Sequence, residues 1–248
     1  MLKRNRGSQL LASILVNAIY AMVNYPIVLI STLLAPFSLL IVITFVSHGT
    51  LLPVAIAGAL IMTMIAAGTS MQQDLSHLKN DFKLQDMIIS SPTSAVTYLV
   101  GMALSEIVYS IPALAVLGIL GAIYISTTAI GYLAIAAVLG IMFVFAVSLG
   151  FLLSTLTSDV VQSWAFAGIV STILSALPPV YYPITYIPLP YQYLAYLSPA
   201  TYAAEIIQNI IGLTAFSGTT ILADWIVITA VAVSVSYIAI KKARWREN

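Results

Sequence analysis

Long apolar runs separated by short polar turns dominate the chain. A helix needs about 20 apolar residues to cross a bilayer core that is about 30 Å thick, and these runs come close to or exceed that length. The pattern predicts six membrane-spanning helices at residues 26–46, 51–71, 92–125, 131–156, 160–177 and 221–240. We therefore expect an all-α integral membrane protein with a single domain over residues 1–248.

The N-terminal segment has a helical period of 3.6 residues instead of a continuous apolar run. Its apolar stripe holds Leu11, Ile14, Leu15, Ile19, Met22 and Val23. Its polar stripe holds Ser13, Asn17, Tyr20 and Asn24, and basic residues precede it at Lys3, Arg4 and Arg6. This pattern predicts an amphipathic helix over residues 5–25 that lies in the membrane interface and is retained in the protein.

A polar segment, QQDLSHLKNDFKLQDMIISSP, separates the second and third runs at residues 72–92. It contains five of the 17 charged residues of the chain, which has nine basic and eight acidic residues. We expect the segment to be solvated, with Leu75, Leu78 and Phe82 continuing the second helix on one face. Asn80 or Asp81 can cap a short helix that is too short to be stable without a partner. The alternative is a hairpin that packs on the ends of its own spans.

The stretch after the fifth run is rich in proline and tyrosine. Residues 178–202 hold six of the 11 prolines and seven of the 14 tyrosines. Proline in a helix interior removes a backbone donor, so this stretch predicts short broken helices over residues 178–215 in the outer interface. Four tyrosines are candidates for a substrate path or outer gate, namely Tyr181, Tyr182, Tyr186 and Tyr202. The alternative is the ordinary enrichment of tyrosine at headgroup level.

Composition and charge agree with a membrane protein. The chain is 61% hydrophobic and 7% charged, and its net charge of +1 gives no reason to expect nucleic-acid binding. All nine basic residues lie before residue 7, at residues 79–83 or after residue 240. The positive-inside rule places these three regions in the cytoplasm, which requires an even number of spans between them. Six spans satisfy this requirement with both termini cytoplasmic.

No catalytic or metal site is predicted. The sequence has no cysteine, two histidines far apart, no phosphate-binding loop and no nucleophile elbow. Glu106 is the one carboxylate well inside a predicted span, and such acids are functional candidates. Ser105, Tyr109 and Ser110 can hydrogen-bond its carboxyl group. Because no titratable partner for a proton relay is evident, a structural role is favoured for Glu106. Glu205 and Asp224 fall in the outer region, where we expect solvent.

These features together resemble the permease subunits of ABC type-2 exporters along nearly the whole chain. Residues 5–25 look like the elbow helix of that family, and DMIISSPTSAVTYLVGMALSEI at residues 86–107 looks like the end of its coupling region. YYPITYIPLPYQYLAYLSPATYAAEII at residues 181–207 resembles its proline-rich re-entrant element. One departure is that Gln208 and Asn209 stand where an arginine is frequent.

The resemblance implies a dimer of permease chains, identical or homologous, with two cytoplasmic ATPase subunits in the cell membrane. ATP and Mg²⁺ would bind on the partner, so no cofactor is expected in this chain. The implied contact with the ATPase is the coupling helix at Asp81, Phe82, Lys83, Leu84, Gln85, Asp86 and Met87. Its movement would tilt spans one, two and five and open a path at the dimer interface.

Two other functions compete with this interpretation. A secondary transporter or channel would show charged or broken helices near the midplane and internal repeats, whereas Glu106 stands alone and no clear repeat is evident. A membrane scaffold or enzyme lacks catalytic pairs. The apolar spans favour export of a hydrophobic or amphipathic substrate such as a drug, a lipid or a glycolipid-like compound.

Overall fold

The computed structural model describes residues 6–80, 95–157 and 159–242, and within these residues the fold is helical without a β-strand. The elements are α1 (Arg6–Ile14), the π-helical turn η1 (Leu15–Ile19), α2 (Tyr20–Asn24), α3 (Ile27–Val46), α4 (Leu52–Asn80), α6 (Ala95–Tyr124), α7 (Ala129–Leu156), α8 (Val160–Ala176), the 3-10 turn η2 (Ile184–Tyr186), α9 (Gln192–Ala195), α10 (Pro199–Ile210) and α11 (Gly218–Lys242). The all-α fold class is thus confirmed for the described part of the chain.

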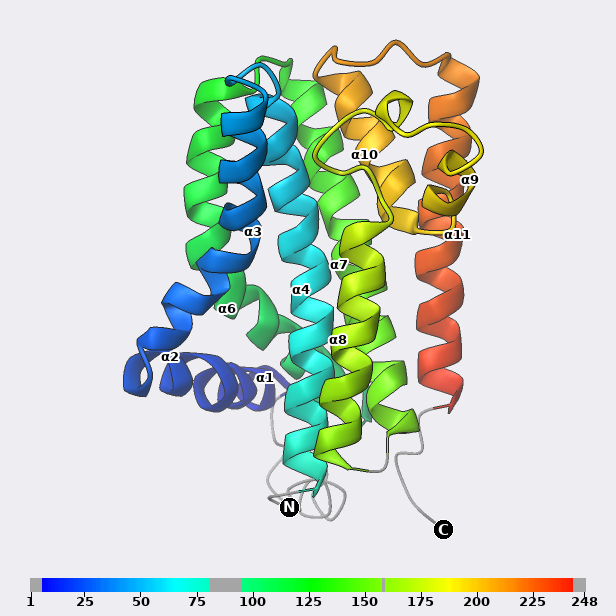
Figure 1. The fold of residues 1–248 in the computed structure, drawn as a ribbon. Helices are drawn as coiled ribbons and strands as arrows, with labels where there is room; N and C mark the ends of the chain where they lie inside the picture. The colour runs from blue at the N-terminus through cyan, green and yellow to red at the C-terminus, as the bar shows by residue number, and fades with distance from the viewer. Residues whose placement is uncertain (1–5, 81–94, 158, 243–248) are drawn as a thin grey trace.

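Six long helices, α3, α4, α6, α7, α8 and α11, form the bundle (Figure 1). We call the end at which α4 and α11 finish the inner end and the opposite end the outer end. Each of the six helices matches one predicted span within a few residues, except that α4 continues well beyond residue 71 and α6 is described only from Ala95. The proposed helix start at Ser91 and Pro92 lies outside the described residues.

Several of the described helices are long and apolar enough to cross a membrane. Five segments qualify, at Gly7–Asn24, Leu52–Leu78, Thr97–Tyr124, Ala129–Leu156 and Gly218–Lys242. Thr32–Val46 and Val160–Ala176 are shorter apolar helices. The chain is therefore a multi-pass membrane protein, while the six-span layout, which counts α3 and α8 and excludes the N-terminal helix, stays a prediction.

The N-terminal helix runs across the bundle axis near the inner end (Figure 1). Its apolar stripe is exposed at Leu11, Leu15 and Val23, whereas Ser13 on the polar stripe is half-buried. Only 6% of Gly7–Asn24 is buried inside the protein. This arrangement suits a helix whose apolar face meets lipid in the interface.

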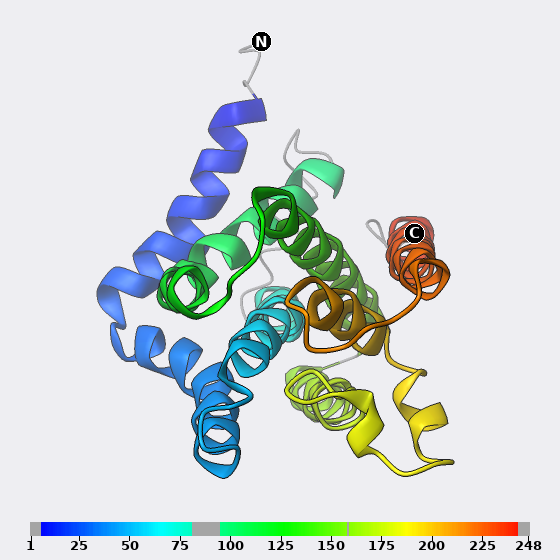
Figure 2. The same cartoon turned by 90° about the horizontal axis from the view of Figure 1, so that it is seen from above.

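Helix α4 is the centre of the bundle, surrounded by α3, α6, α7, α8 and α10 (Figure 2). Its residues from Val54 to Ile61 are all buried. The tightest packing is against α7, where a Cβ added at Gly150 would lie 2.0 Å from the carbonyl oxygen of Gly68. Small residues allow this approach, as is common between membrane helices.

The outer segment between α8 and α11 contains η2, α9 and α10, as the proline-rich pattern predicted. Helix α10 begins with Ser198 as its N-cap and Pro199 at the first turn. It is upright in the outer half of the bundle and is buried along most of its length (Figure 1). At 12 residues it is too short to cross a bilayer.

Candidate functional site

The predicted coupling contact lies outside the described residues. This statement covers all seven candidates, Asp81, Phe82, Lys83, Leu84, Gln85, Asp86 and Met87. The structure does describe the two helices that lead into and out of this segment, α4 up to Asn80 and α6 from Ala95. Any movement of this segment would therefore reach the bundle through the contacts that the inner ends of these two helices make.

Gln72 joins α4 to α8 through a buried hydrogen bond. Its side-chain Nε2 donates to the carbonyl oxygen of Ser163 at 3.0 Å, and both residues are 0% exposed. A second contact joins Nε2 to the hydroxyl of Ser163 at 3.4 Å. The sequence predicted Gln72 and the turn after it to be solvated, but Ser76 is also buried. That expectation was wrong because α8 covers this face of α4.

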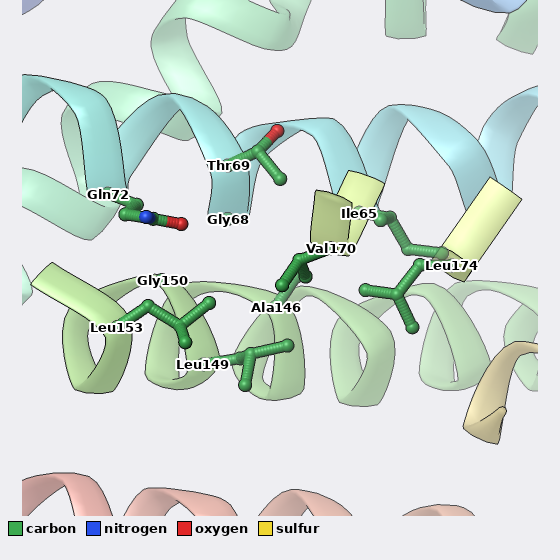
Figure 3. A pocket seen from close by; sticks show the side chains of 10 residues that line it. All are labelled: Ile65, Gly68, Thr69, Gln72, Ala146, Leu149, Gly150, Leu153, Val170 and Leu174. Atoms are coloured by element: carbon green, nitrogen blue, oxygen red, sulfur yellow. The ribbon is translucent and has the colours of Figure 1, made fainter. Parts of the chain in front are cut away.

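The amide oxygen of Gln72 has no hydrogen-bond partner and points into a small cavity between α4, α7 and α8 (Figure 3). The cavity of about 10 Å³ has room for about one water molecule. Its other walls are apolar apart from Thr69 and include Leu149, Val170 and Leu174. The three helices thus pack around the Gln72 amide oxygen, and the rest of their contact is mainly apolar.

Glu106 has a titratable partner that the sequence did not reveal. It is 4% exposed on α6, and its carboxyl group hydrogen-bonds the carboxyl group of Asp74 on α4. His77, Tyr98 and Tyr109 lie within electrostatic range of this pair. The expectation of a lone acid was therefore wrong.

The N-terminal helix is joined to α6 near the same level. The hydroxyl of Ser105 donates to the carbonyl oxygen of Ser13 at 3.3 Å. A Cβ at Gly101 would lie 2.8 Å from the Cβ and hydroxyl of Ser13. Asn17 donates to the Ser13 hydroxyl at 3.1 Å, and both residues are half-buried, whereas Tyr20 and Asn24 farther along the polar stripe are exposed.

The four candidate gate tyrosines form two separate groups at the outer end. Tyr182 and Tyr186 stack with ring centroids 6.5 Å apart, and Tyr181 beside them in sequence is 4% exposed with an unpartnered hydroxyl. Tyr202 lies on α10, where its hydroxyl donates to the carbonyl oxygen of Tyr196 at 3.0 Å. The structure describes all four positions, and their role in a substrate path stays a prediction.

Gln208 stands where the resembled family frequently has arginine, and it fixes α10 to the segment after α8. Its Nε2 donates to the carbonyl oxygens of Pro179 and Tyr182, each at 3.1 Å. Gln208 is 2% exposed. An uncharged amide thus supplies donors for two carbonyl groups without placing a charge in this buried position.

Glu205 and Asp224 are buried rather than solvated, at 1% and 3% exposure. The hydroxyl of Tyr196 donates to Glu205 Oε1 at 2.8 Å, and Oε2 has no partner. Burial raises the pKa of Glu205 to about 7; the Tyr196 hydrogen bond opposes this rise and the nearby Asp224 carboxylate adds to it. The sequence missed these residues because it did not reveal that α10 packs inside the bundle.

A metal centre finds no support in the part of the chain that the structure describes, since no group of three or more His, Asp or Glu side chains is placed to hold an ion there. In the comparison with known families, a family model described as ABC-2 type transporter matches residues 8–211. A search of curated proteins found no match.

Proposed function

Because the chain belongs to the ABC-2 type transporter family, we propose that it is the permease of an exporter driven by ATP hydrolysis on separate cytoplasmic subunits. Membership in this family makes it the membrane component of an ABC transporter, which pairs with ATPase subunits. The sequence contains no phosphate-binding loop, in keeping with ATP and Mg²⁺ binding on the partner. Two ATPase subunits would serve two permease chains, with the termini of each permease in the cytoplasm of the cell.

The observation that carries this proposal is the position of α4. This helix continues from the core of the bundle to Asn80, directly before the proposed coupling segment at residues 81–89, and most residues of Leu52–Leu78 are buried. A long buried helix moves its packing partners when one end is displaced, because close-packed interiors deform little. Movement of the coupling segment would therefore reach α7 through Gly68 and α8 through Gln72.

The second permease chain would pack against α3 and α8. These helices lie on the same side of the bundle (Figure 2). Large apolar side chains are exposed on both, for example Ile30 and Leu34 on α3 and Trp164 and Ile169 on α8. A substrate path between the two copies would open when α4 shifts α8. Its apolar walls suit a hydrophobic or amphipathic substrate.

Copurification tests the coupling contact. The permease would be expressed with the candidate ATPase, and alanine would replace Phe82, Leu84 and Met87 together. We expect the ATPase to be lost from the complex while the permease stays folded, because three apolar side chains of the proposed contact are removed. Alanine at the exposed outer-end residues Tyr124 and Ile130 is the control and should leave the complex intact. Equal retention of the ATPase by both variants would contradict the proposal.

A proton-coupled secondary transporter is the second candidate, and the hydrogen-bonded pair of Asp74 and Glu106 is the observation that favours it. Proton relays in transporters use such intramembrane acids. Glu106→Gln keeps a hydrogen-bonding side chain but removes the exchangeable proton. Transport that survives this substitution and still requires ATP would exclude the relay, whereas ATP-independent transport that is lost in this variant would support it.

A further inference from the structure

A groove of about 160 Å³ lies between α6, α7 and α11 near the inner end of the bundle. Its walls include Ala103 of α6, Phe151 of α7 and Ile240 of α11, and Met71 of α4 also lines it. Apolar cavities of about 150 Å³ stay dry and accept an apolar group of about the size of benzene. The groove is therefore large enough for a segment of a hydrocarbon chain.

The groove offers an apolar ligand no free hydrogen-bond donor. Its two polar lining side chains are Ser148 and Ser236, whose hydroxyl oxygens are 2.8 Å apart. Ser236 donates to the carbonyl oxygen of Ala232 at 2.7 Å, which leaves Ser148 to donate to Ser236. Both hydroxyl protons are thus used within the protein, and a hydrocarbon ligand would leave neither of them unpaired.

The groove reaches the surface of the protein. Its rim residues Val100 and Ile240 are 44% and 60% exposed. Figure 2 shows the inner ends of α6 and α11 on the side of the bundle away from α3 and α8. Among the described residues, none of α3 or α8 lines the groove, so a second permease chain packed against those two helices would not occupy it.

Basic residues follow the groove directly. Ile240 lines it, and Lys241 and Lys242 are the next residues on α11, both exposed. In the sequence Arg244 and Arg246 come shortly after, so the C-terminal segment contains four basic residues. Such a cluster beside a membrane helix attracts anionic headgroups.

We propose that this groove binds one acyl chain of an anionic phospholipid from the inner leaflet, with the headgroup at Lys241 and Lys242. The acyl chain would lie against Phe151 and Met71, which line the groove. A lipid bound there would link α6 to α11, which border the groove on opposite sides of α7. The proposal requires the inner end to face the cytoplasm but does not depend on ATP coupling.

Native mass spectrometry of the full-length permease tests this site. The protein would be mixed with phosphatidylglycerol or phosphatidylcholine of identical acyl chains. We expect phosphatidylglycerol to be retained in preference to phosphatidylcholine. Ala103→Phe should lower its retention about tenfold, which is the effect of losing about two buried methylene contacts. Ala122→Phe is the matched control, since Ala122 is exposed on the same helix outside the groove, and should retain lipid as the unaltered chain does.

Two further variants keep the test decisive. Val100→Trp blocks the rim from an exposed position, so it should lower retention without disturbing the fold. Lys241→Gln with Lys242→Gln should remove the preference for phosphatidylglycerol and leave phosphatidylcholine retention unchanged. Equal retention of the two lipids by the unaltered chain, or equal phosphatidylglycerol retention by the Ala103 and Ala122 variants, would overturn the proposal. No ATPase is present, so this outcome is independent of the proposed export function.

Discussion

The side-chain amide of Gln72 on α4 donates a 3.0 Å hydrogen bond to the carbonyl oxygen of Ser163 on α8, and both residues are fully buried. Bonds of this kind between membrane helices contribute modestly to stability but fix the relative position of two helices. In this chain the bond lies between the core of α4 and the proposed coupling segment. It is thus well placed to make α8 follow α4.

Replacing Gln72 by leucine should uncouple these helices. Loss of one hydrogen bond should lower the free energy of unfolding by about 1 kcal/mol. The larger effect should be on transport, with fewer substrate molecules moved per ATP hydrolysed in proteoliposomes. Gln73→Leu is the matched control because Gln73 is the neighbouring residue on a different, half-buried face of α4. Equal transport-to-hydrolysis ratios in the two variants would refute a coupling role for Gln72.

Gly150→Ala should separate α4 from α7. The new Cβ would lie 2.0 Å from the carbonyl oxygen of Gly68, a backbone atom that cannot rotate away. Overpacking of this kind costs about 1–3 kcal/mol in unfolding free energy. Gly140→Ala on the same helix meets no atom within 4 Å and should be neutral or stabilising by up to about 1 kcal/mol. Unfolding in a denaturing detergent titration measures both, and similar midpoints would show that the contact is looser than described.

Gly101→Ala should displace the N-terminal helix from α6, since the new Cβ would lie 2.8 Å from Ser13. The chain has no cysteine, so a single cysteine introduced at Asn17 can report on the contact by its rate of reaction with a water-soluble thiol reagent. We expect faster labelling in the Gly101 variant because the half-buried position 17 becomes more accessible. Gly118→Ala, which meets no atom within 4 Å on the same helix, should leave the rate unchanged.

Stability should fall as the pH rises through the titration range of Glu205. The pKa of this carboxyl group is raised from 4.5 to about 7 on folding, chiefly by burial. The folded state then binds the proton more tightly than the unfolded state, so its contribution is full below about pH 4.5 and is lost by about pH 7. Glu205→Gln should flatten this part of the curve of thermal unfolding against pH.

Tyr196→Phe should shift the pH dependence that Glu205→Gln is expected to flatten. The Tyr196 hydroxyl donates to Glu205 Oε1 at 2.8 Å and favours the charged carboxylate. Its removal should raise the pKa of Glu205 further and move the loss of stability to higher pH. A shift to lower pH, or an unchanged profile in the Glu205→Gln protein, would show that another group controls this pH range.

The long helices could be predicted from the sequence because an apolar run of bilayer length leaves the backbone little choice other than a helix. The start of α8 could also be predicted, because Asp159 is a residue type that favours a helix N-cap. In the structure Asp159 accepts a 2.7 Å hydrogen bond from the backbone N–H of Gln162. The short helices after α8 followed from the density of proline. These features depend on local chemistry, which a sequence displays directly.

The buried polar contacts could not be predicted in the same way. Gln72 and Glu205 are polar residues whose sequence neighbours do not reveal whether the surrounding space is filled by water or by another helix. Their burial results from α8 packing on α4 and from α10 entering the bundle. The partnership of Asp74 with Glu106 likewise depends on how α4 and α6 cross. Such contacts require the tertiary arrangement.

Transport by the permease in proteoliposomes, measured with and without its ATPase subunit, tests the central claim most directly. An amphipathic fluorescent substrate would be followed in vesicles that contain the permease alone, the permease with ATPase, and the permease with ATPase and ATP. The account predicts accumulation only in the third preparation, with loss of accumulation when Phe82, Leu84 and Met87 are replaced by alanine. Equal transport by the permease alone would contradict it.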